Sequence, residues 1–276
     1  MLRTHEHINE RLAQAERLWL FLDYDGTLAD FAPTPDHVNP DPELIGLLTR
    51  LARHPRIRMA VISGRRLSHV EVLVPVTGVF LAGTYGIEIR TSEGERINRV
   101  EYEAIRRTLN ALKSRWLRLT AGRDGFYLED KYWALALHAR FADEDEAEEV
   151  LTAARSMATG AACSGPFRLL GGHKFLEIGP TLAHKGQTVD YLLDRYPWPG
   201  ALPVYLGDDD KDEEAFGVVR ARGGIAILVT RVPRDTKADC CLESPRAVHH
   251  WLENLRILLP SKNSCSQPTS QCSPRF

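Results

Sequence analysis

Short apolar runs alternate along the chain with segments in which apolar residues recur every three or four positions. The runs cover residues 18–23, 56–64, 201–208 and 223–230. Most are nearly continuous in hydrophobicity, which is typical of strands buried on both faces of a parallel sheet. Helical spacing is found at 41–54, 185–196 and 212–223. This alternation predicts an α/β fold whose core is a doubly wound, Rossmann-like parallel sheet.

The middle of the chain has a different pattern. Helical spacing at 102–116 and at 143–158 is each followed by two segments in which apolar and polar residues alternate. The first two segments predict antiparallel strands joined by a turn near Asp130. The second two predict a hairpin in which Gly171 and Gly172 supply the positive φ of a tight turn.

The predicted order αββαββ indicates an α+β cap domain inserted into the core. We expect the core over 1–100 and 180–260 and the cap over 101–179. The remaining segment, 261–276, is rich in Ser, Gln and Pro, and we expect it to be disordered.

Composition limits the classes of partner. The 35 basic and 37 acidic residues give a net charge of −2, with no indication of nucleic-acid binding. No apolar run approaches the roughly 20 residues of a membrane helix, so we expect no membrane partner. The charged N-terminal segment predicts an amphipathic surface helix and not a secretory signal. The five cysteines show no CxxC spacing, which favours neither zinc nor a disulfide framework, and we expect a cytoplasmic protein.

Polar side chains gather where the predicted strands end and helices begin. They are Asp23, Asp25, Ser63, Lys185, Asp208, Asp209 and Asp212. Ligands of doubly wound sheets bind at the carboxyl ends of the strands. Five carboxylates beside one lysine remain under-neutralised, and like charges raise each other's cost of ionisation. Hard oxygen ligands completed by water and a substrate phosphate are the pattern of Mg²⁺.

Such a site suits hydrolysis of a phosphate monoester, a reaction that is very slow without catalysis. We infer that Asp23 attacks phosphorus to form an aspartyl-phosphate. Asp25 then serves first as acid for the leaving sugar oxygen and later as base for water, its proton favoured by crowded anionic surroundings. Ser63 and Lys185 would bind the phosphoryl oxygens. Mg²⁺ would be held by Asp23, the backbone carbonyl of Asp25, and Asp208.

The motifs "DYDGTL", "ISGR", the lysine of "HKG" and "GDDDKDE" occur in an order that resembles the haloacid-dehalogenase superfamily, in its branch with a C2-type cap. Three further blocks, "AGTYGIEIR", "EDKYWALALHAR" and "HKFLEIGPTLAHKG", resemble the trehalose-6-phosphate phosphatase family. The resemblance covers about 18–255. It implies Mg²⁺-dependent hydrolysis of trehalose 6-phosphate and a trehalose-phosphate synthase as pathway partner. Lys211 stands where the family usually has threonine.

Carried over by position, the resemblance implies a metal at Asp23, Asp25 and Asp208, with Thr27, Asp209 and Asp212 in support. It implies that the substrate is bound by Gly64, Arg65, Lys131, His138, Arg140, His173, Lys174 and Glu177. The segment "GTYG", residues 83–86, would be a loop close to the substrate. Glu177 lies between Leu176 and Ile178 and is expected on the opposite face of its strand.

Other interpretations remain open. Lys131 and Arg140 are alternatively surface charges, His138 a structural histidine and Ser63 a helix cap. The protein is alternatively a phosphatase of another glycosyl phosphate, such as sucrose phosphate or a glycosyl-phosphoglycerate, or a sugar phosphomutase. A non-catalytic domain of a trehalose-synthesis assembly is a further alternative, although every chemical position is filled.

Overall fold

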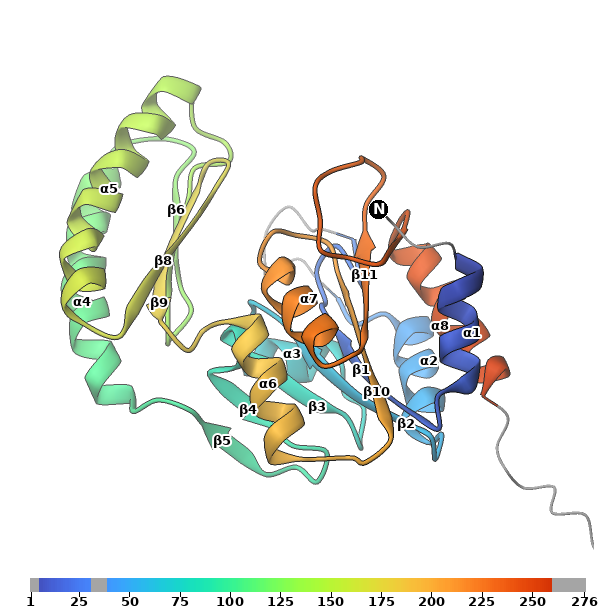
Figure 1. The fold of residues 1–276 in the computed structure, drawn as a ribbon. Helices are drawn as coiled ribbons and strands as arrows, with labels where there is room; N and C mark the ends of the chain where they lie inside the picture. The colour runs from blue at the N-terminus through green and yellow to red at the C-terminus, as the bar shows by residue number, and fades with distance from the viewer. Residues whose placement is uncertain (1–4, 31–38, 260–276) are drawn as a thin grey trace, which may run out of the picture.

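Two sheets organise this computed structural model, which describes residues 5–30 and 39–259 (Figure 1). The predicted disorder of 261–276 falls outside the described residues, as do Cys265 and Cys272. Within the described ranges, none of the helices combines the length and the apolar character needed to cross a bilayer.

The larger sheet has eight strands in the order β12-β11-β10-β1-β2-β3-β4-β5. Their bounds are β1 Arg17–Leu22, β2 Ile57–Ile62, β3 Phe80–Gly83, β4 Glu88–Arg90, β5 Arg96–Asn98, β10 Ala201–Gly207, β11 Ile225–Val229 and β12 Cys240–Leu242. From β12 to β3 all neighbours are parallel, and β4 and β5 add an antiparallel edge. The four apolar runs form β1, β2, β10 and β11. The short strands β3, β4, β5 and β12 were not predicted, because three or four positions show too little periodicity.

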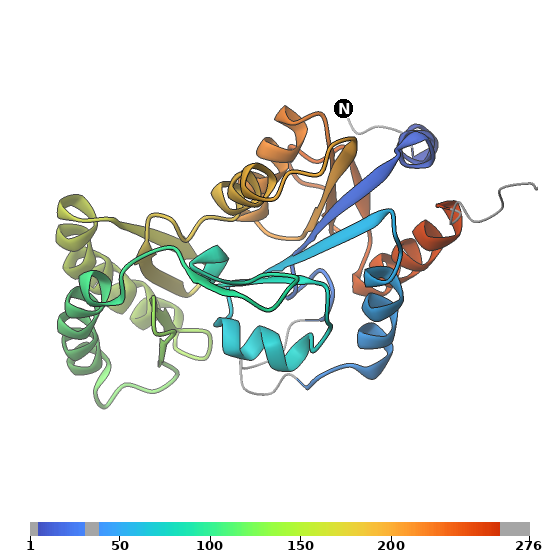
Figure 2. The same cartoon turned by 90° about the horizontal axis from the view of Figure 1, so that it is seen from below.

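Helices cover both faces of this sheet (Figure 2). One face carries α1 His5–Gln14, α2 Pro42–Ala52, α3 Leu67–Leu73 and α8 Pro245–Leu258, and the other carries α6 Lys185–Arg195 and α7 Asp212–Ala221. In β1, Leu18 and Leu20 pack into the first layer, whereas Trp19 and Phe21 pack into the second. Burial on both faces explains the continuous hydrophobicity of the strands and confirms the doubly wound core.

The smaller sheet belongs to the cap. Its strands are β6 Tyr127–Asp130, β7 Leu135–His138, β8 Phe167–Gly172 and β9 Phe175–Pro180, in the antiparallel order β6-β7-β9-β8. Helices α4 Tyr102–Thr120 and α5 Glu144–Ser164 cover the side of this sheet that faces away from the core (Figure 1). The αββαββ order is as predicted. The exact division of the chain at 101 and 179 stays a prediction.

The β8–β9 turn differs from the prediction. Gly171 and Gly172 are the last residues of β8 and pair with β9. The turn itself is formed by His173 and Lys174, and Lys174 takes the positive φ of 51°. A Cβ on Gly171 would lie 2.4 Å from Nη2 of Arg155. The Arg155 guanidinium on α5 thus lies close to Gly171, and assigning this glycine to the turn was wrong.

Candidate active site

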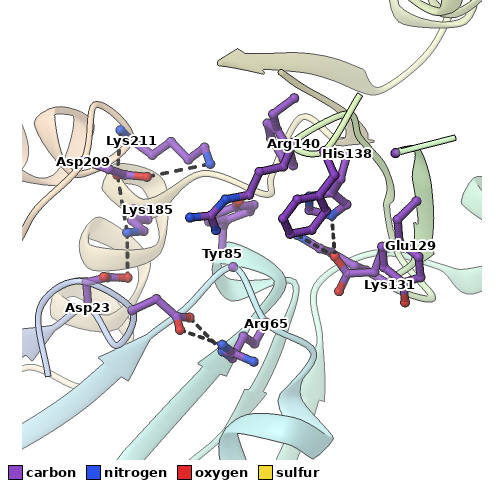
Figure 3. A pocket seen from close by; sticks show the side chains of 16 residues that line it. Asp23, Arg65, Tyr85, Glu129, Lys131, His138, Arg140, Lys185, Asp209 and Lys211 are labelled. Atoms are coloured by element: carbon purple, nitrogen blue, oxygen red, sulfur yellow. Dashed lines mark hydrogen bonds and ion pairs between the residues drawn. The ribbon is translucent and has the colours of Figure 1, made fainter. Parts of the chain in front are cut away.

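The carboxyl ends of β1, β2 and β10 meet at one edge of the core sheet, where a cavity of about 290 Å³ separates them from the cap (Figure 3). Its core wall consists of Asp23, Asp25, Gly64, Arg65, Tyr85, Lys185, Asp209 and Lys211. Its cap wall consists of Gly125, Tyr127, Glu129, Lys131, His138, Arg140, Phe141 and Phe175. β2 and β10 flank the parallel strand β1 on opposite sides, so the strand order changes direction at β1. Ligands of α/β sheets bind at such switch points.

Asp23, directly after β1, is paired with a buried lysine. Lys185 Nζ donates to Asp23 Oδ1 at 2.7 Å and to Asp212 Oδ1 at 2.6 Å. Lys185 is the first residue of α6, and its neighbour His184 caps that helix. Burial disfavours the lysine's charge, but Asp212 and Asp23 outweigh it and raise the pKa of Lys185 well above its ordinary value. The ammonium is therefore a permanent positive charge beside the Asp23 carboxylate.

Asp212 organises the loop between β10 and α7. Its Oδ1 accepts hydrogen bonds from Lys185 Nζ and from the Tyr205 hydroxyl, and its Oδ2 accepts from the backbone N–H groups of Asp208 and Asp209. A carboxylate offers about four lone-pair sites, so these four bonds fill them. Gly207 is required beside it, because a Cβ there would lie 2.2 Å from Asp212 Cγ. Asp212 thus shapes the loop, and each of its two oxygens already accepts two hydrogen bonds.

The acidic cluster fits a divalent cation. Oxygen atoms of Asp23, Asp208 and Asp212 all lie within 4.8 Å of one another. Burial, together with the neighbouring carboxylates, raises the pKa of Asp23 to about 8 and that of Asp208 to about 7. A cation would favour ionisation of the crowded oxygens. Both oxygens of Asp212 already accept two hydrogen bonds each, so Asp23 and Asp208 are the more available ligands. Thr27 Oγ1 donates to Asp208 Oδ1 at 3.3 Å.

Asp25 has a cationic partner. Arg65 donates from Nε to Asp25 Oδ2 at 2.7 Å and from Nη2 to Oδ1 at 2.6 Å (Figure 3). We expected anionic groups to surround Asp25, but the side chain that contacts its carboxylate is the cation Arg65. The same loop contains Ser63, whose Oγ accepts from the Arg65 backbone N–H at 3.1 Å. The first turn of α3 has no side-chain cap, so Ser63 does not serve as one.

The loop Gly83–Gly86 brings Tyr85 to the cavity. Thr84 and Tyr85 have φ values of 46° and 55°, a left-handed conformation that non-glycine residues rarely adopt. Thr188 on α6 stabilises it by donating from Oγ1 to the Tyr85 carbonyl at 2.7 Å. The Tyr85 ring lies beside Gly64, where a Cβ would be 2.7 Å from the Tyr85 hydroxyl. This close approach explains the glycine in "ISGR".

One face of the cap sheet packs against helices, and the other face lines the cavity. Leu128, Leu135, Leu137, Leu176 and Ile178 pack under α4 and α5. Residues at alternate positions, Tyr127, Glu129, His138 and Phe175, line the cavity. The period-2 alternation of strands produces this division. It also places Glu177 opposite Leu176 and Ile178, where it is buried and accepts from Lys131 Nζ at 2.6 Å.

The predicted cap residues therefore divide into three groups. Lys131, His138 and Arg140 line the cavity. Glu177 lies behind Lys131 and is not part of the lining. The structure does not bring His173 and Lys174 to the cavity. His173 is exposed in the turn, and Lys174 donates to the Ala142 carbonyl at 2.7 Å and pairs with Glu144.

Sequence analysis also missed cavity residues. Glu129 was not predicted as a site residue, yet it lines the cavity and its Oε2 lies 3.0 Å from His138 Nε2. Tyr127, Phe141 and Phe175 add aromatic surface to the cap wall. Alternation with buried leucines could have indicated Tyr127, Glu129 and Phe175, but Phe141 follows β7 in a loop and carries no such signal.

Comparison with known proteins agrees with this geometry. Residues 21–246 match a family model described as trehalose-phosphatase. The chain is 31% identical over 262 residues to trehalose-phosphate phosphatase B of Arabidopsis thaliana, covering 88% of this chain and 67% of that protein. It is 34% identical over 245 residues to the trehalose-phosphate phosphatase of Mycolicibacterium paratuberculosis, covering 86% and 61%. The C-terminal domain of the C. albicans trehalose-6-phosphate phosphatase has the same fold, with a TM-score of 0.81 at 21% identity and coverage of 94% and 99%.

Proposed function

This chain belongs to the trehalose-phosphatase family, and from that premise we propose that it hydrolyses trehalose 6-phosphate to trehalose and inorganic phosphate. One observation supports this most strongly. The buried Asp23–Lys185 pair lies at the end of β1, on the wall of a cavity whose opposite wall carries Lys131, His138 and Arg140. A carboxylate nucleophile thereby faces basic side chains across the cavity, which suits a phosphate ester.

The acidic cluster is proposed to hold Mg²⁺. Asp23 and Asp208 would supply carboxylate oxygens, and Asp25 would add its backbone carbonyl. Asp209 and Asp212 order the loop, and Thr27 orients Asp208. When bound, Mg²⁺ would supply positive charge opposite the transferring phosphoryl group.

The reaction is proposed to proceed in two displacements. In the first, a carboxylate oxygen of Asp23 bonds to phosphorus as the phosphorus–sugar oxygen bond breaks, and Asp25 gives its proton to that oxygen, which releases trehalose. In the second, Asp25 takes a proton from water as the water attacks phosphorus, which releases phosphate and restores Asp23. Lys185 and Ser63 bind phosphoryl oxygens throughout. Arg65 orients the ionised Asp25 through its two hydrogen bonds.

The cap is proposed to bind the sugar and to exclude water from the aspartyl-phosphate. Arg65 and Gly64 would meet the substrate from the core, and Lys131, His138 and Arg140 from the cap. Glu177 would act by fixing Lys131. The substrate is a phosphorylated disaccharide, so a trehalose-phosphate synthase is the proposed pathway partner.

Phosphate release from several sugar phosphates tests this function. We expect trehalose 6-phosphate to exceed sucrose 6-phosphate, glucose 6-phosphate and glucosyl-3-phosphoglycerate by more than about tenfold in kcat/KM. EDTA should abolish release and Mg²⁺ should restore it. Release of phosphate from none of these esters would refute the proposal, and a preference for another ester would refute the substrate.

A pair of variants tests the nucleophile. Asp23→Asn should form no labelled phosphoryl-enzyme and should lose nearly all turnover. Asp194→Asn is the matched control, because Asp194 is exposed and pairs only at the surface with Arg222. Turnover of Asp23→Asn within about tenfold of the parent would contradict the assignment.

A further inference from the structure

Lys211 extends from the core's acidic loop toward the cap. It precedes α7, and its backbone N–H donates to Asp209 Oδ1 at 2.9 Å. Its Nζ lies 5.5 Å from the centre of the Tyr85 ring in the core and 5.0 Å from that of Phe175 in the cap. An ammonium within about 6 Å of a ring face is attracted by the ring quadrupole. Two aromatic rings from different domains therefore position this ammonium.

Within the described residues, this ammonium forms an ion pair but no short hydrogen bond. The nearest carboxylate oxygen, Asp209 Oδ2, lies 3.7 Å from Nζ, which is beyond hydrogen-bonding distance. No other hydrogen-bond acceptor for Nζ is found in residues 5–30 and 39–259. The side chain is 24% exposed and forms part of the cavity wall. Lys185 differs, because both its short bonds go to buried carboxylates.

The position of Lys211 relative to the nucleophile indicates which part of a substrate it meets. Lys185 contacts Asp23 directly, whereas Lys211 lies on the other side of Asp209 (Figure 3). The Lys211 ammonium is thus farther than the Lys185 ammonium from the place where Asp23 would meet phosphorus. It lies next to the cap residue Phe175. The part of the ester that extends from the phosphoryl group toward the cap is the sugar.

We propose that Lys211 is a specificity-determining residue that donates hydrogen bonds to sugar hydroxyls of the substrate, held in place by the ring faces of Tyr85 and Phe175. This inference rests on the proposed function. Because one ring belongs to each domain, the ammonium reaches the sugar only while the cap lies over the core. Lys211 thereby favours esters whose alcohol carries hydroxyls over esters whose alcohol carries none.

The test compares two substrates. Trehalose 6-phosphate offers sugar hydroxyls, and phenyl phosphate offers none. Lys211→Met should lower the ratio of their kcat/KM values about tenfold, mainly through KM for trehalose 6-phosphate. Lys211→Arg keeps the charge and the ring contacts and should keep the ratio within about threefold of the parent. Lys237→Met, which changes an exposed lysine between β11 and β12 that is not part of the cavity wall, is the control and should not change the ratio.

Product inhibition provides a readout that does not depend on turnover of the ester. The inhibition constant of trehalose should rise about tenfold in Lys211→Met, whereas that of inorganic phosphate should stay unchanged. If Lys211 only supports the acidic loop, both substrates lose activity equally, and that result overturns the proposal. An unchanged ratio with unchanged trehalose inhibition overturns it too. If the parent prefers another sugar ester, the proposed function fails, and the same comparison with that ester and its alcohol still tests Lys211.

Discussion

Gly86 occupies a position where even one additional carbon collides with the neighbouring helix. Its φ is 98°, and a Cβ there would lie 2.0 Å from Thr188 Oγ1 and 2.4 Å from Thr188 Cγ2. Thr188 Oγ1 also donates to the Tyr85 carbonyl and accepts from Arg99. We therefore expect Gly86→Ala to displace Thr188 and release the loop that carries Tyr85 into the cavity.

The loss of unfolding free energy in Gly86→Ala can be estimated by comparison with Gly78→Ala as a matched control. Gly78 has a φ of 80° and nothing within 4 Å of a built Cβ, so Gly78→Ala carries only the conformational penalty, about 1–2 kcal/mol. Gly86→Ala adds overpacking of about 1–3 kcal/mol and the lost hydrogen bond to Tyr85, about 1 kcal/mol. We expect about 3–6 kcal/mol of lost unfolding free energy at Gly86, at least about 2 kcal/mol more than at Gly78.

Denaturant unfolding of both variants measures this difference. Thr188→Ala removes the two closest atoms, so the double variant Gly86→Ala/Thr188→Ala should be less destabilised than the sum of the single changes. KM for the sugar ester should rise in Gly86→Ala and not in Gly78→Ala, because only the first moves Tyr85. Equal destabilisation at the two glycines would refute the steric argument, and additivity with Thr188→Ala would refute the named contact.

Two further predictions concern ion pairs. Arg65→Lys should lower kcat about tenfold or more, because an ammonium cannot hold both oxygens of Asp25 in one orientation; an unchanged kcat in steady-state assays would contradict this. Burial raises the pKa of Asp130, but hydrogen bonds from Arg106 and Lys113 outweigh it and hold that pKa below its ordinary value. Its contribution to stability is then present above the unfolded pKa of about 4 and is lost as pH falls through the folded pKa. When the pH falls from about 6 to about 3, the denaturation midpoint of Asp130→Asn should therefore fall less than that of the parent. An equal fall in both proteins would exclude the ion pairs of Asp130 with Arg106 and Lys113 as the cause.

The core and its acidic site could be predicted from the sequence because their signals are local. Continuous apolar runs identify buried parallel strands, and residues that follow such strands must meet at one edge of the sheet. Asp23, Asp208 and Asp212 were brought together by this rule, and Lys185 was added as the first residue of a predicted helix. The role of the residues within the cluster could not be predicted this way. That Asp212 accepts four hydrogen bonds, and that Arg65 holds Asp25, depends on side-chain geometry that no spacing encodes.

The cap shows where prediction from the sequence ends. Alternation along β9 separates Glu177 from Leu176 and Ile178, but only the packing of α4 and α5 decides which face is left for the cavity. The strand register then moves His173 and Lys174 into the turn. Lys211 is one cation of a charged loop in the sequence, and only the docked cap brings Phe175 to its ammonium. The sequence by itself determined the class of fold and the acidic chemistry, because both follow from neighbours along a strand. The tertiary structure alone decided which cap and loop residues face the cavity, because contacts between distant segments depend on how two separately packed layers meet.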